Sequence, residues 1–238
     1  MVEPEHVFRA SELTRGGSLS ARALKMIAGK LMQRGFVMLP SDTCYSVAAL
    51  PLNEHVRNKI NKMLGRPDME ISLAFPSAHS ARKHVRLGLA GEMLLQSFCP
   101  GPITIVCPTN PKRIPAGFAR NIAAPDQTIG VRIPDSIIER DVAGSTEYPV
   151  TTVAVRDGEG DGVRSFEQAL EIVSRGMKRI DGPGWFAIEG ADFYERHSTV
   201  VRVAGPSDVR LLREGHIPFT VIQAAVRQLP AVDPEEWS

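Results

Sequence analysis

The chain has 238 residues, 28 Lys and Arg against 27 Asp and Glu, and a formal net charge of +1. Hydrophobic residues make up 43% and charged residues 23%, which excludes a wholly disordered chain and suits one large α/β domain. The near-zero net charge disfavours a protein whose main task is to coat nucleic acid, although it leaves room for a local basic groove.

The chain carries no signature of a disulfide framework, a structural metal site or a membrane span. Its three cysteines, Cys44, Cys99 and Cys107, have no CxxC spacing, and the histidines form no HExxH motif. No run of about 18 apolar residues occurs, and the N-terminus is polar and acidic. We therefore expect a cytoplasmic protein with no bound structural metal and no membrane partner; the reactivity of Cys44 stays open.

Residues 1–19 lack periodicity and predict a loosely held lead-in, and the acidic residues 229–238 predict a frayed tail. Asn53 is the expected N-cap of the second helix. In chain order, apolar periodicity and turn residues predict helix 20–35, strand 36–39, helix 53–64, strand 71–75, a helix from 77, helix 89–98, strand 103–107, a long loop over 108–127, strands 127–133 and 150–155, a flexible turn over 157–162, helix 165–174, strands 199–203 and 210–212, and helix 218–227.

Helices and strands alternate without a repeat or a clear linker. This order predicts a single α/β domain over residues 20–228, built around one sheet. The crossovers differ in length, so we expect a mixed sheet. No P-loop, GxGxxG or GxSxG motif occurs. What remains are polar clusters just past strand ends, where α/β sheets build their sites.

The first three clusters each have a functional and a structural interpretation. Ser41, Asp42 and Thr43 directly follow a buried strand and could orient a small polar ligand, but spacing alone favours a capped turn. Arg66 lies between a glycine and a proline at the end of a predicted helix, where it could bind a phosphate or a carboxylate in a bidentate manner. It could equally do no more than interact favourably with the helix dipole. Thr104 stands at the start of a strand, shortly after Gly101, which would allow a ligand to approach the backbone closely. The same segment could equally be a rigid structural corner.

Arg132 gives a stronger functional signal. Strand alternation directs Val131 and Ile133 to one face and Arg132 to the other, and a buried arginine is costly unless it meets an anion. We therefore expect Arg132→Ala to abolish nucleotide binding with little loss of stability, because an unpaired buried arginine contributes little to folding. Ser198 and Arg213 stand in two late clusters that could equally be ordinary capping.

Together the clusters predict a polyanion site. Arg66, Arg132 and Arg213 converge with several hydroxyls, without an acidic metal cluster or a nucleophile–base pair, which favours a nucleoside triphosphate. We expect these three arginines to share one cavity, with the acidic segments 157–161 and 233–236 elsewhere.

The order and spacing of these clusters resemble the YrdC family, which includes the threonylcarbamoyl-adenylate synthases and YciO-like paralogues. The resemblance runs from Ala21 to Ala225. Its six motifs, in chain order, are PSDTCY at 40–45 for the family's PTDTxYG, GRP at 65–67 for KGRP, PGPIT at 100–104 for PGPxT, GVRIP at 130–134 for GxRxP, STVV at 198–201 and LREG at 212–215 for LRxG.

The resemblance implies a twisted open α/β sheet with a large basic cavity. It implies ATP-dependent condensation of threonine and bicarbonate into threonylcarbamoyl-AMP, for modification of adenosine-37 of tRNA, with Mg²⁺ accompanying the nucleotide. Thr43 and Arg66 would be the catalytic residues at the amino-acid and carbamoyl end. The residues implied for substrate or nucleotide binding are Ser41, Asp42, Tyr45, Thr104, Arg132, Ser198 and Arg213.

Two family groups are replaced in this chain. Leu64 stands where the KxR motif has its lysine, and Val153–Val155 fall on the SxN motif. Three functions therefore stay open. One is formation of a carbamoyl- or acyl-adenylate from ATP with an altered small acid, and another is a paralogue that binds ATP, AMP, tRNA or double-stranded RNA without synthase chemistry. The third is a partner in carbamoyl transfer.

Overall fold

The computed structural model describes all residues except 10–17, 68, 159, 161, 191–192 and 231–238. Most of the expected tail, and parts of the expected lead-in and of the 157–162 turn, lie outside the described residues. In the part of the chain that the structure describes, no helix is both long and apolar enough to cross a membrane.

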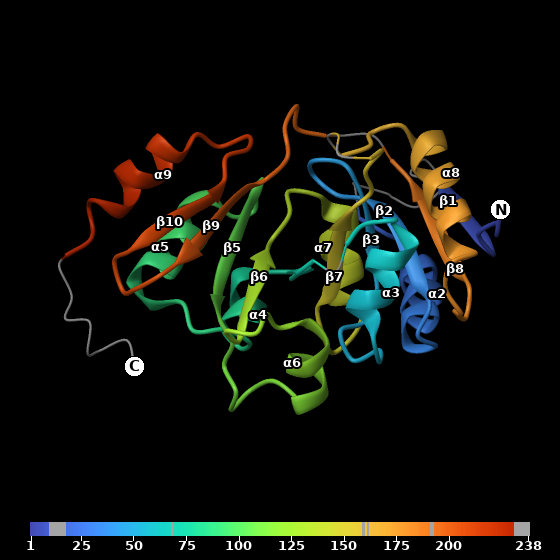
Figure 1. The fold of residues 1–238 in the computed structure, drawn as a ribbon, viewed down its shortest axis with the longest axis horizontal. Helices are drawn as coiled ribbons and strands as arrows, with labels where there is room; N and C mark the ends of the chain where they lie inside the picture. The colour runs from blue at the N-terminus through green and yellow to red at the C-terminus, as the bar shows by residue number, and fades with distance from the viewer. Residues whose placement is uncertain (10–17, 68, 159, 161, 191–192, 231–238) are drawn as a thin grey trace.

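The centre of the molecule is one ten-stranded sheet (Figure 1). Its spatial order is β1 (His6–Arg9), β8 (Trp185–Glu189), β2 (Phe36–Pro40), β3 (Tyr45–Ala48), β7 (Val150–Ala154), β4 (Ser72–Ala74), β6 (Thr128–Arg132), β5 (Ile103–Pro108), β9 (Thr199–Val203) and β10 (Val209–Arg213). Four neighbouring pairs are parallel and five are antiparallel. The predicted α/β class and mixed sheet are therefore confirmed.

Helices cover the sheet in groups that differ along its length. The described helices are α2 (Ala21–Met32), α3 (Val56–Met63), α4 (Ala78–Arg82), α5 (Gly88–Phe98), α6 (Ala116–Ile122), α7 (Ile137–Gly144), α8 (Phe166–Met177) and α9 (Phe219–Val226). Figure 1 places α5 and α9 at the β9–β10 end of the sheet, and α2 and α8 at the β1–β8 end.

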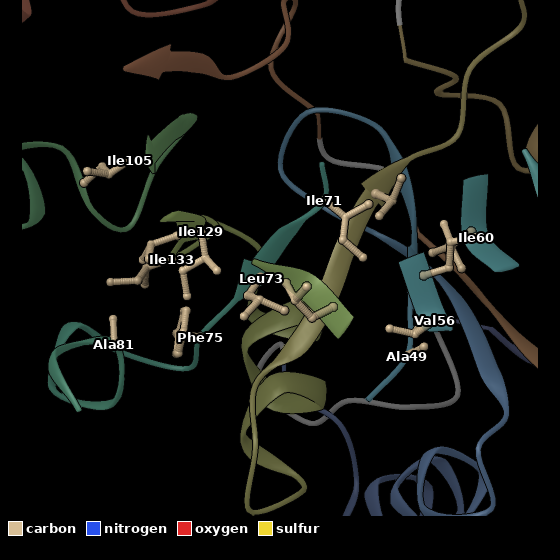
Figure 2. Packing of buried hydrophobic residues seen from close by; sticks show 14 of the residues in the cluster. Ala49, Val56, Ile60, Ile71, Leu73, Phe75, Ala81, Ile105, Ile129 and Ile133 are labelled. Atoms are coloured by element: carbon tan, nitrogen blue, oxygen red, sulfur yellow. The ribbon is translucent and has the colours of Figure 1, made fainter. Parts of the chain in front are cut away.

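Two hydrophobic clusters occupy opposite faces of β2. Val37 and Leu39 join α2 and α7 in the smaller cluster, whereas Phe36 and Met38 belong to the larger one. This alternation confirms a strand buried on both faces, as its unbroken apolar run predicts. The larger cluster continues through β4, β5 and β6, where Figure 2 shows side chains such as Leu73, Ile105 and Ile129.

In the half of the sheet around β5, one face is core and the other is left for a site. Ile103, Ile105 and Cys107 of β5 are buried in the larger cluster. Thr104 and Val106, which alternate with them, line a cavity. The same strand thus contributes to the core with one face and lines the cavity with the other.

Five elements differ from the sequence expectation. They are β1 in the expected lead-in, β3, α6 in the expected long loop, α7, and β8. The strands are four or five residues long and pair mostly across long sequence distances, so local periodicity carried little signal. β1 is held by its parallel pairing with β8 and by Phe8, which is 4% exposed and packs against Phe186.

The start of α3 also differs. Its N-cap is His55 in the left-handed region, with φ 56°, and not Asn53. Asn53 is instead buried, and its backbone oxygen accepts a hydrogen bond from Asn121 Nδ2 at 3.1 Å. The expected cap is thus part of the packing between α3 and α6.

Candidate active site

A cavity of about 910 Å³ lies against the face of the sheet that β7, β4, β6, β5 and β9 form, and the C-terminal ends of α3 and α8 border it. A volume of this order can hold a nucleotide-sized ligand. Two carboxylate residues, Glu70 and Asp157, line it. Eight arginines line it as well: Arg66, Arg132, Arg156, Arg164, Arg175, Arg179, Arg202 and Arg213. The excess of guanidinium groups makes the cavity suited to anions.

Six of the nine expected site residues lie on this lining, and three do not. The six are Thr43, Arg66, Thr104, Arg132, Ser198 and Arg213. Ser41, Asp42 and Tyr45 lie behind the lining, each no more than 1% exposed. The motif residues therefore divide into groups that face the cavity and groups that support it.

Thr104, Ser198 and Arg213 form a hydrogen-bonded group from three elements. Thr104 Oγ1 on β5 lies 3.0 Å from Ser198 Oγ, just before β9. Arg213 Nη2 at the end of β10 donates to the Ser198 carbonyl at 2.9 Å and to its hydroxyl at 3.3 Å. Parallel pairing of β5 with β9, and antiparallel pairing of β9 with β10, brings the three side chains together.

Arg132 is paired within the protein, which corrects the expectation that it is unpaired. Its Nη2 donates to Asp42 Oδ1, and its Nη1 to Ser41 Oγ at 3.4 Å. Asp42 Oδ2 also accepts from the backbone N–H of Asp135 at 3.0 Å. The side chains of Arg132 and Asp42 are 7% and 1% exposed. Burial, the largest single cause, would lower the pKa of Arg132, but the charges of Asp42 and Glu139 and the hydrogen bond to Asp42 together outweigh it and raise that pKa.

Glu139 lies in the same buried region, on α7. Its exposed fraction is 0%, and neither carboxylate oxygen has a hydrogen bond of ordinary geometry, although Ser41 and Thr152 are near. Burial raises the pKa of this carboxyl group, and the charge of Arg132 only partly opposes the shift. Sequence reasoning missed Glu139 because an acidic residue in the first turn of a helix is ordinary.

Tyr45 is a packing residue, which corrects its expected role in binding. Its hydroxyl donates to the Gly190 carbonyl and accepts from the Gly190 N–H at 3.0 Å. Its ring contacts Phe166 and Phe193. The neighbouring Cys44 does line the cavity, but burial raises the pKa of its thiol, which disfavours a reactive thiolate.

Arg66 is carried into the cavity by the end of α3. Gly65 takes the left-handed conformation, with φ 64°, and the Arg66 N–H bonds to Asn61 O at 3.0 Å. Among the described residues, the buried Arg66 Nε has no hydrogen-bond partner. Burial and the charge of Arg156 both lower the pKa of Arg66. The guanidinium group is thus placed for an external anion.

Five lining arginines were not predicted from the sequence. Arg156 follows β7, Arg164 precedes α8, Arg175 is in α8 and Arg179 follows it, and Arg202 is in β9. A sequence signal existed for one of them. Arg202 alternates with the buried Val201 and Val203 along a predicted strand, so this alternation directs it away from the core.

The cavity lining also includes residues at the replaced family motifs and in the acidic turn. Leu64, Val153 and Ala154 line the cavity. Leu64 and Val153 therefore stand on the lining at positions where the family pattern, as aligned above, has a lysine and a serine, whereas Val155, at the position of the asparagine, is buried away from it. Asp157 also lines the cavity, which corrects the expectation that its acidic segment lies elsewhere. Asp233–Glu236 lie outside the described residues.

Comparison with known proteins identifies the family and the fold. The family model Sua5_yciO_yrdC, described as "Telomere recombination", matches residues 30–215. A protein of Methanocaldococcus jannaschii named a putative threonylcarbamoyl-AMP synthase is 26% identical over 200 residues, which cover 83% of this chain and 88% of that protein.

Two solved structures share the fold. Sua5 of P. abyssi, complexed with L-threonine, matches with a TM-score of 0.73 and 22% identity, over 92% of this chain and 60% of that one. YciO of E. coli matches with a TM-score of 0.71 and 17% identity, over 88% and 94%. The chain thus spans less than two thirds of that Sua5. The family model matches most of the chain, and the chain therefore belongs to the Sua5/YciO/YrdC family.

Proposed function

We propose that the chain binds ATP and transfers its adenylyl group to a small carboxylate or carbamate, to give an acyl- or carbamoyl-adenylate and pyrophosphate. The observation that carries the proposal is the gathering of Arg66, Arg132 and Arg213 with Thr104 and Ser198 on one cavity. Membership of the family, and the relative named as a threonylcarbamoyl-AMP synthase, support it.

The two ends of the cavity suit different parts of the reaction. The Thr104–Ser198–Arg213 group offers hydroxyls and one guanidinium for the nucleotide and its phosphates. Thr43 and Arg66 offer a hydroxyl and an unpartnered guanidinium Nε for the acid. Arg132 also lies on the lining, and its ion pair with Asp42 holds its positive charge in a fixed position.

The reaction needs positioning more than covalent participation by the protein. An oxygen of the acid attacks the α-phosphorus of ATP and forms a new P–O bond. The bond from that phosphorus to the bridging oxygen breaks, and its electron pair leaves with pyrophosphate. Arginines near these oxygens would neutralise the charge that develops on them.

Mg²⁺ would enter with the phosphates of ATP. Across the described residues, no group of three or more His, Cys, Asp and Glu side chains could hold a metal ion. The cavity carboxylates Glu70 and Asp157 are therefore better regarded as second contacts for a hydrated ion that the nucleotide brings.

Pyrophosphate release tests the proposed activity. The purified protein is incubated with ATP, Mg²⁺, bicarbonate and L-threonine, and then with other amino acids in place of threonine. We expect release of pyrophosphate that depends on the acid. A protein that binds ATP yet releases no pyrophosphate with any of them would overturn the proposal.

The second candidate is a nucleotide- or RNA-binding paralogue without this chemistry. The observation that favours it is that Leu64 and Val153 line the cavity at positions where the family pattern has a lysine and a serine. Binding of ATP, AMP, tRNA and double-stranded RNA is measured at 50 and 200 mM salt. This alternative predicts binding without turnover, with RNA affinity falling steeply as salt rises.

A further inference from the structure

Three arginines gather at the α3–α8 end of the cavity. Arg66 follows α3, Arg179 follows α8, and Arg156 follows β7. A Cβ atom on Gly65, the residue before Arg66, would lie 2.7 Å from Arg179 Nη1. Arg156 is near enough for its charge to act on Arg66. We call Arg66, Arg156 and Arg179 the arginine cluster.

No described carboxylate neutralises this cluster within ion-pair distance. Three of the other five lining arginines do have a carboxylate partner: Arg132 pairs with Asp42, Arg175 with Glu171, and Arg202 with Asp126 at 2.5 Å. The remaining two, Arg164 and Arg213, donate to backbone carbonyls. Arg179 donates to one backbone carbonyl, Met63 O, at 3.4 Å. The C-terminus of a helix attracts cations, which explains in part why Arg179 lies at the end of α8. This attraction does not explain Arg66, whose buried Nε has no hydrogen-bond partner among the described residues.

Bringing three guanidinium groups together in a half-buried place is unfavourable unless an anion joins them. A single carboxylate, as on threonine, offsets one charge. Three charges call for a ligand that carries at least two negative groups at this end. The cluster also stands apart from Thr104 in β5, Ser198 just before β9 and Arg213 in β10, which belong to the β5–β9–β10 end of the sheet.

We propose that the arginine cluster is a subsite for a second anionic group on the acid substrate, so that the preferred acid is a dicarboxylic or phosphorylated amino acid. This inference rests on the proposed function for the assignment of the acid to the Arg66 end. The acid would place one anionic group between Arg66 and Arg156, and Arg179 would close the outer side of the subsite, where it is exposed.

Calorimetric titration tests the subsite without any turnover. The probes are L-threonine, L-glutamate and O-phospho-L-threonine, each with and without a non-hydrolysable ATP analogue. We expect the better of the two anionic probes to bind at least tenfold more tightly than threonine. Arg156→Gln and Arg179→Gln should each reduce that preference to threefold or less.

Lys178→Gln is the matched control, because Lys178 carries the same charge next to Arg179 and does not line the cavity. Its probe affinities should stay within twofold of the unmodified protein. Thermal melting checks that each variant is folded; if Arg156→Gln does not fold, Arg179→Gln, whose side chain is exposed, decides the outcome.

Three results would overturn the subsite. They are threonine binding as tightly as the anionic probes, no binding of any anionic probe at millimolar concentration, or arginine variants that weaken only the ATP analogue. The last would mean that the cluster holds the phosphate chain of the nucleotide. Arginine-dependent binding of an anionic acid without pyrophosphate release would leave the subsite standing and reject the adenylylation chemistry, so the two failures are distinguishable.

Discussion

The guanidinium of Arg132 on β6 is hydrogen-bonded to the carboxylate of Asp42, which follows β2, and both side chains are buried. The two residues are 90 positions apart in sequence. The ion pair therefore ties together two motifs that sequence reasoning had assigned separately to a ligand. It also reverses an expectation about stability.

We expect Arg132→Ala and Asp42→Ala each to lower the free energy of unfolding by about 3–5 kcal/mol, because each leaves the other charge buried and unpaired. The double variant should cost clearly less than the sum. Urea denaturation measures all three. Arg82→Ala, which breaks the half-exposed pair with Glu92, should cost about 1 kcal/mol or less and serves as the control.

A second prediction concerns the pH dependence that Glu139 contributes. Its pKa is raised in the folded protein above the ordinary value of 4.5. Above pH 4.5 the folded state therefore holds a proton that the unfolded state has released, and stability falls as pH rises toward the folded pKa. Glu139→Gln removes this loss.

The stability of the Glu139→Gln variant relative to the unmodified protein should therefore increase from pH 4.5 to pH 8. Urea denaturation at several pH values measures this difference. Glu171→Gln, an exposed change on α8, should alter stability by about 0.5 kcal/mol or less at every pH. A Glu139→Gln difference that stays constant with pH would contradict the assignment.

The packing of α8 on α3 gives a third prediction. A Cβ atom on Gly176 would lie 2.1 Å from Met63 O, so α3 must shift to accept it. Gly176→Ala should cost about 1–3 kcal/mol of stability. It should also weaken ATP binding, because the displaced end of α3 carries Gly65 and Arg66. Isothermal titration with ATP and thermal melting measure the two effects.

Gly29→Ala in α2 is the control for that experiment. A Cβ atom there meets nothing within 4 Å. The helix interior favours alanine over glycine by roughly 0.5–1 kcal/mol, so this variant should be slightly more stable and bind ATP unchanged. Equal behaviour of the two glycine variants would argue that the α3–α8 contact does not position the site.

A fourth prediction restores a family group. Leu64 lines the cavity two residues before Arg66, so Leu64→Lys should place an ammonium group on the lining. We expect about tenfold tighter ATP binding, or about 1.4 kcal/mol, with a steeper loss of affinity as salt rises. Lys62→Leu, at an exposed position outside the lining, should change ATP affinity by less than twofold.

The fold was predictable where the apolar pattern is local. Helix 20–35 and the strand that begins at Phe36 were expected from periodicity and are present as α2 and β2. β1 and β8 were not expected, because β1 is four residues long and its register is set by pairing with a strand about 180 residues away. A four-residue strand offers too few positions for an alternating pattern to be recognised.

The site was predictable in its motif arginines and less so in their roles. Nothing local to Arg132 indicates that its anion is Asp42 and not a ligand, because their contact depends on the order of strands in the sheet. Arg156 and Arg179 belong to no motif, and only the packing of α3, α8 and β7 brings them beside Arg66. The charge that these arginines bring to the site could therefore be recognised only from the folded structure.

The most direct test of the central claim is exchange of labelled pyrophosphate into ATP, which reports reversible formation of an adenylate. We expect exchange only when an acid substrate is present, with bicarbonate where the acid is a carbamate, and we expect Arg213→Ala to abolish it. Exchange that is absent with every acid, in protein shown by titration to bind ATP, would contradict the account and leave nucleotide binding alone.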